Sequence, residues 1–154
     1  MKFPSRKLVV LETNIDDMNP EWFDPLLERL FQSGVLDASL IPITMKKSRP
    51  AVLLQVLVEP KRRDQTLQII FEETTTLGVR SYPVDRYELQ RETRSVKTPY
   101  GNVRVKIGKG PDGTIFNVAP EYRSCLEVAK GKKVPLKEIY LAAIRCLPPN
   151  KFGG

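Results

Sequence analysis

The order of apolar patterns in the first 90 residues restricts the fold more than any other feature of this chain. Continuous or alternating apolar runs, which are typical of strands, are interrupted twice by amphipathic helical patterns. The order βαββαβ is the split-βαβ or ferredoxin-like arrangement, so we expect one sheet with two helices on one face. The expected strands are residues 7–14, 35–44, 51–59 and 79–89, and the expected helices are residues 20–33 and 61–76.

Turn residues support these boundaries. Pro20 suits the first helical position, and Gly34 and Gly78 are expected to end the two helices, Gly78 in the left-handed conformation. The short basic segment 45–50 between two strands predicts an antiparallel hairpin. The apolar residues expected to face the core are Trp22, Phe23, Leu26, Leu27, Leu30 and Phe31 in the first helix and Leu67, Ile70 and Phe71 in the second.

The pattern changes in the second half, where turn signals become dense. We therefore expect an α+β protein with two subdomains packed as one unit. Residues 1–90 form the ferredoxin-like subdomain, and residues 91–154 form a small β-meander followed by two helices. The tail from Pro148 is expected to be frayed. The expected elements after residue 90 are strands 94–98, 103–109 and 114–119 and helices 120–130 and 135–146.

Composition excludes several kinds of chemistry. Histidine is absent from the 154 residues, which rules out a His general base, a Ser-His-Asp triad and a His-ligated zinc or nickel site within this chain. Cys125 and Cys146 match no zinc spacing and are expected to be buried free thiols. No apolar stretch approaches the roughly 20 residues that span a bilayer, and residues 8–11 are too short for a signal peptide, so we expect a cytoplasmic protein.

The formal net charge of +7 favours anionic partners. The basic residues are spread along the chain, however, and no RNP, KH or zinc-finger signature is present. An RNA-binding protein is therefore one alternative, but the charge alone supports it.

An acidic segment, residues 12–21, joins the first strand to the first helix. It contains four carboxylates and two carboxamides. Magnesium prefers carboxylate oxygens and keeps several waters, so the adjacent Asp16 and Asp17 are candidate ligands. The alternative is that Asn19 caps the helix and the Asp pair is a solvated loop.

Two further segments have the chemistry of phosphate binding. Lys46, Lys47 and Arg49 place three cations at the expected hairpin tip. The alternative is a solvated turn whose charges keep an edge strand from pairing. After the second helix, the three hydroxyls of residues 74–76 and the following Arg80 are candidate donors to an anion.

A third candidate is the start of the helix expected from Pro120. Glu121 and Tyr122 lie in its first turn, where free N–H groups and the helix dipole favour anions. Glu121 is explained equally well as a complement to the dipole. Neither a Gly-x-Gly-x-x-Gly nor a Walker A loop is present.

Four segments in this order, residues 12–21, 45–51, 76–80 and 119–122, resemble one family over nearly the whole chain. The chain is similar to the carboxy-terminal region of the nickel insertion proteins that make the nickel-pincer nucleotide cofactor. The resemblance implies an enzyme of the lyase or chelatase class. It inserts nickel into a pyridinium bisthiocarboxylate mononucleotide and splits CTP to CMP and pyrophosphate with Mn or Mg present.

The resemblance makes these residues candidates for the CTP and metal site, and their individual tasks are inferred from their chemistry, since the motif match alone assigns none. Asp16 and Asp17 would bind the divalent cation and, with Lys46, would form the catalytic group. The other residues expected to contact CTP are Lys47, Arg49, Thr76, Arg80, Glu121 and Tyr122.

Complete family members carry a long amino-terminal part with a histidine-rich stretch, whereas here Met1 stands eleven residues before the signature. We therefore expect the nickel-binding part on the same or a separate chain. The resemblance also implies a homo-oligomer. Alone, this chain is not expected to insert nickel. The alternative function is a non-catalytic nucleotide-sensing or assembly module of ferredoxin-like fold.

Overall fold

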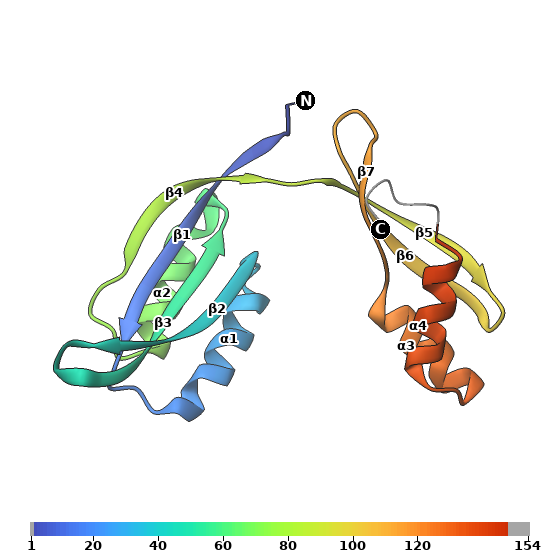
Figure 1. The fold of residues 1–154 in the computed structure, drawn as a ribbon. Helices are drawn as coiled ribbons and strands as arrows, with labels where there is room; N and C mark the ends of the chain where they lie inside the picture. Colours follow the sequence, from blue (N-terminus) through green and yellow to red (C-terminus); the bar gives the residue numbers. More distant parts are fainter. Residues whose placement is uncertain (1, 148–154) are drawn as a thin grey trace. The chain divides into compact units, whose positions relative to one another are not determined.

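The computed structural model describes residues 2–147 of the chain. It divides into two compact units, each described below by itself (Figure 1). One unit is Ser5–Arg86, and the other consists of the described residues of Met1–Pro4 and Tyr87–Gly154. The expected packing of the two halves as one unit stays a prediction.

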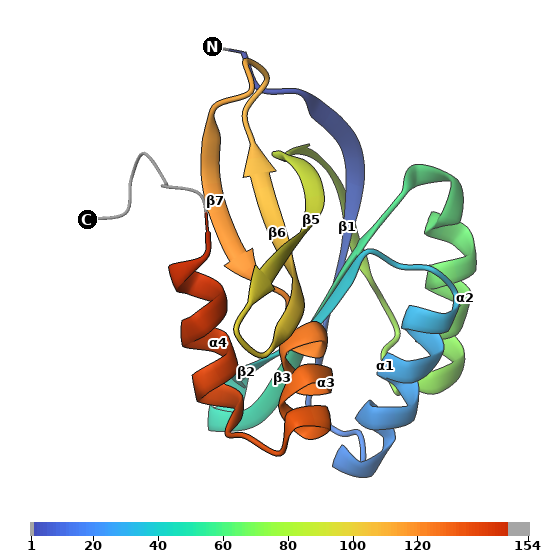
Figure 2. The same cartoon turned by 90° about the vertical axis from the view of Figure 1, so that its right-hand side faces the viewer.

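The Ser5–Arg86 unit has the expected ferredoxin-like order. Its sheet has the strand order β2-β3-β1-β4, with β3 antiparallel to both of its neighbours. Both helices lie on the same face of this sheet (Figure 2). The elements are β1 (Ser5–Ile15), α1 (Phe23–Gln32), β2 (Asp37–Met45), β3 (Arg49–Val58), α2 (Arg63–Glu73) and β4 (Arg80–Tyr87), with short 3₁₀ turns at Pro20–Trp22, Lys46–Ser48 and Pro60–Arg62.

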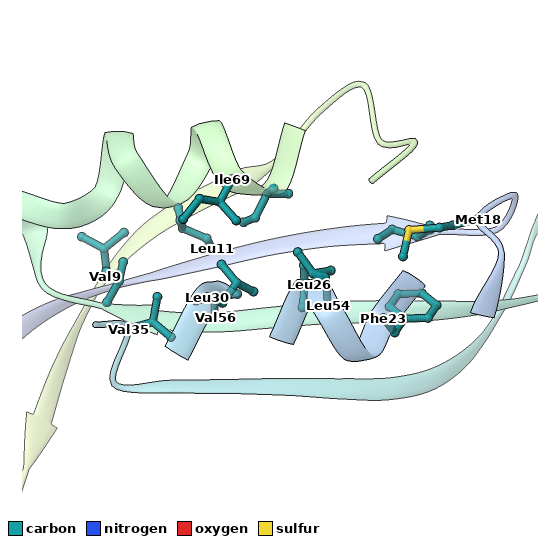
Figure 3. Packing of buried hydrophobic residues seen from close by; sticks show 13 residues of the cluster. Val9, Leu11, Met18, Phe23, Leu26, Leu30, Val35, Leu54, Val56 and Ile69 are labelled. Carbon is teal, nitrogen blue, oxygen red and sulfur yellow. The ribbon is translucent and has the colours of Figure 1, made fainter. Parts of the chain in front are cut away.

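The core of this unit lies between the sheet and the two helices. Alternate strand residues point to opposite faces of the sheet, and those on the face that the helices cover are buried. Met18 and Phe23 lie at one end of the cluster, where the chain passes from β1 to α1 (Figure 3). The acidic segment is therefore anchored to the core. The other buried members are Val9, Leu11, Ile15, Leu26, Leu30, Val35, Leu54, Val56, Val58, Ile69 and Ile70.

Three aromatic side chains expected in the core are exposed instead. Trp22, Phe31 and Phe71 retain 49%, 50% and 47% of their accessible surface. In α2 the apolar residues are consecutive, so their pattern does not choose one helical face. Packing against the sheet selects Thr66, Ile69 and Ile70, which have the i, i+3, i+4 spacing of one face.

The second helix ends earlier than expected, at Glu73. Thr74 has extended backbone, and its hydroxyl donates to the carbonyl of Ile70 at 2.7 Å. Gly34, with φ +86°, follows α1 as expected, but Gly78 is not among the positive-φ glycines of the described chain. Residues 75–77 therefore form a loop rather than a last helical turn.

The second unit contains the expected meander and helix pair. Its strands form an antiparallel sheet in the order β5-β6-β7, and α3 and α4 contact this sheet and each other. Val103, Cys125 and Ile139 are fully buried members of its core. The elements are β5 (Gln90–Thr98), β6 (Gly101–Lys109), β7 (Ile115–Pro120), α3 (Tyr122–Lys132) and α4 (Leu136–Arg145).

Two expectations for this unit are corrected. Pro120 ends β7 rather than opening a helix, and the N–H of Glu121 donates to the carbonyl of Arg104 at 2.8 Å, next to the β6–β7 ladder. Cys125 is buried, and burial raises the pKa of its thiol, but Cys146 is exposed. The expected frayed tail from Pro148 lies outside the described residues. None of the helices described in residues 2–147 is long and apolar enough to cross a membrane.

Candidate functional site

The acidic segment leaves the sheet at the end of β1. Ile15 and Met18 are buried on either side of Asp16 and Asp17, so the two carboxylates are held between two core anchors. The side chain of Asn19 accepts a hydrogen bond from the N–H of Glu21 at 3.1 Å. The capping function expected for Asn19 is therefore confirmed, and it leaves both aspartates available.

The hairpin brings a cation to this loop. Arg49 begins β3, and its Nη1 atom donates to Oδ2 of Asp16 at 3.2 Å. The register explains the contact, because Ile15 pairs with Val52 and the start of β3 therefore lies beside the end of β1. The two segments are 33 residues apart in sequence, and the sheet brings their charged groups together.

The tip of the hairpin has unusual backbone. Lys47 and Ser48 have φ values of 61° and 56°, in the left-handed region that costs a residue with a side chain about 1–2 kcal/mol. Lys46 and Lys47 are exposed, and neither forms an ion pair with another residue in the described part of the chain. Strained backbone conformations are concentrated at functional sites, so this exposed basic tip is a candidate functional segment.

The loop after α2 supplies a hydroxyl group to this cluster from one of the three candidate threonines. Thr75 donates to Oδ1 of Asp17 at 2.5 Å. The hydroxyl of Thr76 instead lies 2.5 Å from that of the buried Thr13 and donates to the carbonyl of Gly78 at 3.0 Å. Three successive threonines in the sequence gave no signal that could separate their tasks.

Arg80 belongs to a polar network on the sheet face opposite the core. Its Nη2 atom donates to Oδ1 of Asn14 at 2.9 Å and lies 3.7 Å from Oε2 of Glu12. Glu12 also accepts from the hydroxyl of Tyr82 at 2.6 Å and from Nε2 of Gln55 at 2.7 Å. These two bonds and the charge of Arg80 lower the pKa of Glu12, and the bond to Glu12 raises the pKa of Tyr82.

This network was missed in the sequence. Glu12 and Asn14 are in the acidic segment but had no expected task, and neither Gln55 nor Tyr82 was singled out. The only available signal was that Glu12 and Asn14 alternate with the inward-facing residues of β1. Gln55 lies 43 residues from Glu12, and Arg80 lies 66 residues from Asn14. Only the sheet register brings residues so far apart in sequence into contact.

Glu121 and Tyr122 belong to the other compact unit. Glu121 precedes the first residue of α3 and accepts a hydrogen bond from Nε of Arg104 at 2.9 Å, while Tyr122 is exposed. The partner of Glu121 therefore belongs to the meander, and a contact of Glu121 or Tyr122 with CTP stays a prediction.

The two carboxylates at the end of β1 suit a metal ion whose remaining ligands are supplied by a bound phosphate compound. Within residues 2–147, no group of three or more His, Cys, Asp or Glu side chains could hold a metal ion. Asp16 and Asp17 each use one oxygen in the contacts with Arg49 and Thr75, which leaves the other oxygen of each. Magnesium is commonly held by one or two carboxylates together with substrate phosphates, so these residues fit such an ion.

Comparison with known proteins assigns the family. Residues 2–140 match the sequence model of the family described as nickel insertion protein. The chain belongs to this family. The resemblance inferred from four ordered motifs is thereby confirmed.

Relatives named pyridinium-3,5-bisthiocarboxylic acid mononucleotide nickel insertion protein show the extent of the similarity. That of Thermotoga petrophila is 45% identical over 141 residues, which are 92% of this chain and 35% of the relative. That of Clostridium kluyveri is 44% identical over 136 residues, which are 88% of this chain and 34% of the relative. The chain thus spans about a third of the length of the curated relatives it matches.

Two solved structures share the fold of this chain. The fold is similar to LarC2, the C-terminal domain of a cyclometallase involved in the synthesis of the NPN cofactor of lactate racemase, with a TM-score of 0.86 and 34% identity. That match covers 93% of this chain and 98% of the other. A Methanopyrus kandleri protein shares the fold, with a TM-score of 0.69 and 24% identity.

Proposed function

We propose that this nickel insertion family domain binds CTP with a divalent cation, Mn²⁺ or Mg²⁺, during synthesis of the nickel-pincer nucleotide cofactor. The observation that carries the proposal is the meeting of three separate segments at the end of β1. Asp16 contacts Arg49 from the hairpin, and Asp17 contacts Thr75 from the loop after α2. Two carboxylates beside a basic tip are the groups that a metal–triphosphate complex requires.

Asp16 and Asp17 would hold the cation, because one carboxylate oxygen of each is not used by Arg49 or Thr75. When bound, the cation neutralises phosphate charge as a Lewis acid. Lys46, Lys47 and Arg49 contact the phosphates, and Lys46 is the proposed catalytic cation beside the leaving group. Arg80 contributes a further guanidinium, whereas Thr76 orders the loop that presents Thr75.

The proposed reaction breaks the bond between the α-phosphorus and the oxygen bridging to the β-phosphate. Pyrophosphate leaves with that oxygen, and with water as the acceptor the products are CMP, pyrophosphate and a proton. The proposed contribution of the chain is electrostatic stabilisation of charge on the leaving pyrophosphate by its cations. The contact of Arg49 with Asp16 holds one of these cations in place before the nucleotide binds.

In the complete system, the proposed substrate is the mononucleotide for which the relatives are named, and nickel is the metal inserted. The nickel-binding part is the region of the relatives that this chain does not match, on the same or a separate chain. We also propose that the domain acts in the cytoplasm as a homo-oligomer. Glu121 and Tyr122 are proposed as a second contact with a bound anion.

Calorimetry tests the nucleotide site directly. We expect tight binding of CTP that requires Mn²⁺ and exceeds the binding of ATP, GTP and UTP. Asp16→Ala is expected to remove the Mn²⁺-dependent part. Equal binding of all four nucleotides, or none, would remove CTP from the proposed function.

A second candidate is a nucleotide-sensing or assembly module that binds CTP without splitting it. It needs only the binding groups already described, Asp16 with Arg49 and Asp17 with Thr75, and no group that activates an acceptor. Incubation with CTP and Mn²⁺ followed by product analysis separates the two, because only the first candidate produces CMP and pyrophosphate.

A further inference from the structure

Strand register gathers cations on one face of the β5-β6-β7 sheet. Val103, Val105 and Ile107 of β6 are buried, so the residues between them lie on the opposite face, which we call the outer face. We propose that the outer face binds the sugar–phosphate backbone of single-stranded RNA. Such binding is separate from the proposed cation site, which depends on Asp16 and Asp17 in the other unit. The outer face consists of Arg91, Thr93, Ser95 and Lys97 of β5 and Asn102, Arg104 and Lys106 of β6.

The four cations of the outer face form one row. Arg104 and Lys106 are two residues apart on β6, a step of about 6.8 Å along the strand. Lys97 pairs with the residue two before Arg104, and Arg91 pairs with the residue two after Lys106. Each of these β5 cations therefore lies diagonal to a β6 cation, at about 7–8 Å. Cations at similar steps along one line fit the repeating charge of a single linear polyanion.

The two lysines of the row are available for a partner. Lys97 and Lys106 are exposed, and neither forms an ion pair or a hydrogen bond with another residue in the part of the chain that the structure describes. The strand residues of the outer face include no carboxylate. The charge of both ammonium groups is therefore directed to solvent, where an anion can reach it.

The two arginines of the row are only partly neutralised. Nε of Arg104 donates to Oε2 of Glu121 at 2.9 Å, and Nη2 of Arg91 lies 4.0 Å from Oε1 of Glu88. The side chains of Arg104 and Arg91 nevertheless expose 53% and 79% of their surface. Exposed ion pairs of this kind are weak, so a phosphate can share these guanidinium groups.

The polarity of the outer face favours a nucleic acid over a protein. Protein–protein interfaces have an apolar core enriched in aromatic residues, whereas nucleic-acid interfaces are more polar and positively charged. The outer face includes neither an aromatic nor an aliphatic residue, and the apolar Leu89 lies against Gly108 at one end of the row. Bases have no ring to stack on, so the contacts go to the backbone and carry no sequence preference.

Hydroxyl groups beside the cations favour RNA over DNA. Ser95 pairs with Arg104 and Thr93 pairs with Lys106, so one hydroxyl lies beside each β6 cation. Both hydroxyl side chains are exposed, and neither forms a hydrogen bond with another described residue. The ribose 2′-hydroxyl donates and accepts, and it is the group by which a protein distinguishes RNA from DNA.

Fluorescence anisotropy with the full chain and a labelled oligouridylate of about 12 nucleotides tests the proposal. We expect the logarithm of the association constant to fall with the logarithm of the salt concentration with a slope of about −3, because each of the four phosphate contacts contributes about −0.7. Lys97→Gln combined with Lys106→Gln should weaken binding at least tenfold in about 50 mM salt and bring the slope to about −1.4.

The matched control is Lys130→Gln combined with Lys132→Gln. It removes the same charge from the last turn of α3, away from the outer face, and should change neither the affinity nor the slope. Circular dichroism of each variant controls for folding. Equal losses in the two lysine pairs would show that net charge alone binds the strand, and would overturn the outer face as the site.

A DNA strand of the same sequence tests the assignment to RNA. We expect RNA to bind about tenfold more tightly, because two hydroxyls bond to the ribose. Thr93→Val combined with Ser95→Ala should remove that preference and leave the salt slope unchanged. Equal affinity for the DNA strand, or for a polyglutamate peptide of the same length, would overturn the assignment. Absence of RNA binding would overturn the whole inference, whereas the proposed CTP site would be unaffected.

Discussion

The two compact units differ in how they carry charge. Ser5–Arg86 holds 11 of the 25 Lys and Arg residues and 12 of the 18 Asp and Glu residues, a net charge of −1, so the rest of the chain carries +8. In Ser5–Arg86, charged and polar groups meet across segments, as in the contact of Arg49 with Asp16. In the other unit, ion pairs such as that of Lys109 with Glu92 also join strands, but further cations such as Lys97 and Lys106 are exposed on strands.

This difference teaches that net charge and site chemistry are separate properties. The charge of +7 pointed to anionic partners, but it belongs to the unit that lacks the acidic segment. The proposed phosphate site instead depends on the local arrangement of a few cations near two carboxylates. The contrast predicts that a change in one unit leaves the properties of the other unaltered. Substitutions in one unit, followed by measurements on the other, test this.

The largest effect is expected from cavities in the two cores. Leu26→Ala and Ile139→Ala each remove a fully buried side chain, one from each unit, and should cost about 2–5 kcal/mol of unfolding free energy. Below its unfolding transition, Ile139→Ala should still bind CTP if the site lies in Ser5–Arg86. Chemical denaturation and calorimetry measure the two properties, and loss of binding by the folded Ile139→Ala variant would break the comparison.

The second largest effect is expected for Asp16→Ala. Loss of a contact that stabilises transition-state charge costs about 2.7–4 kcal/mol, so CTP-dependent activity in the complete system should fall at least a hundredfold. The melting temperature should change little, because Asp16 is a loop residue between core anchors. The matched control is Glu127→Ala, an exposed carboxylate on α3, which should retain full turnover.

A smaller effect is expected at the hairpin tip. Lys47→Gly and Ser48→Gly both relieve left-handed backbone and should raise the unfolding free energy by about 0.5 kcal/mol each, after the entropic cost of glycine. Only Lys47→Gly removes a cation, so it alone should weaken CTP binding. Equal affinities of the two variants would exclude Lys47 from the phosphate site.

The smallest effect concerns acid stability of the second unit. Hydrogen bonds from Arg94 and Lys109 lower the pKa of Glu92 to about 2, so its contribution to stability is complete above the unfolded pKa near 4.5 and is lost as pH falls toward 2. Glu92→Gln should therefore flatten the decline of melting temperature between pH 4.5 and 2. An unchanged pH profile would show that these exposed pairs contribute nothing.

Much of the fold was predictable because strand and helix periods differ and turn residues mark their boundaries. The βαββαβ order, the hairpin at residues 45–50 and the meander were all read from these signals. The failures occurred where several side chains were chemically equivalent, as in the consecutive apolar residues of α2, so that Phe71 was expected inside and Ile69 was not. The proline signal also failed at Pro120, where strand pairing continued through the residue that suits a helix start.

For the candidate site too, some features were determined by the sequence and others only by the tertiary structure. The sequence by itself determined which groups are available: two adjacent carboxylates after a buried strand, a basic tip, and no histidine. Only the tertiary structure decided which of them meet, because contacts such as Asp16 with Arg49 and Asp17 with Thr75 join segments 33 and 58 residues apart. Local patterns encode the period of an element, whereas strand register and helix packing set which distant side chains share a surface.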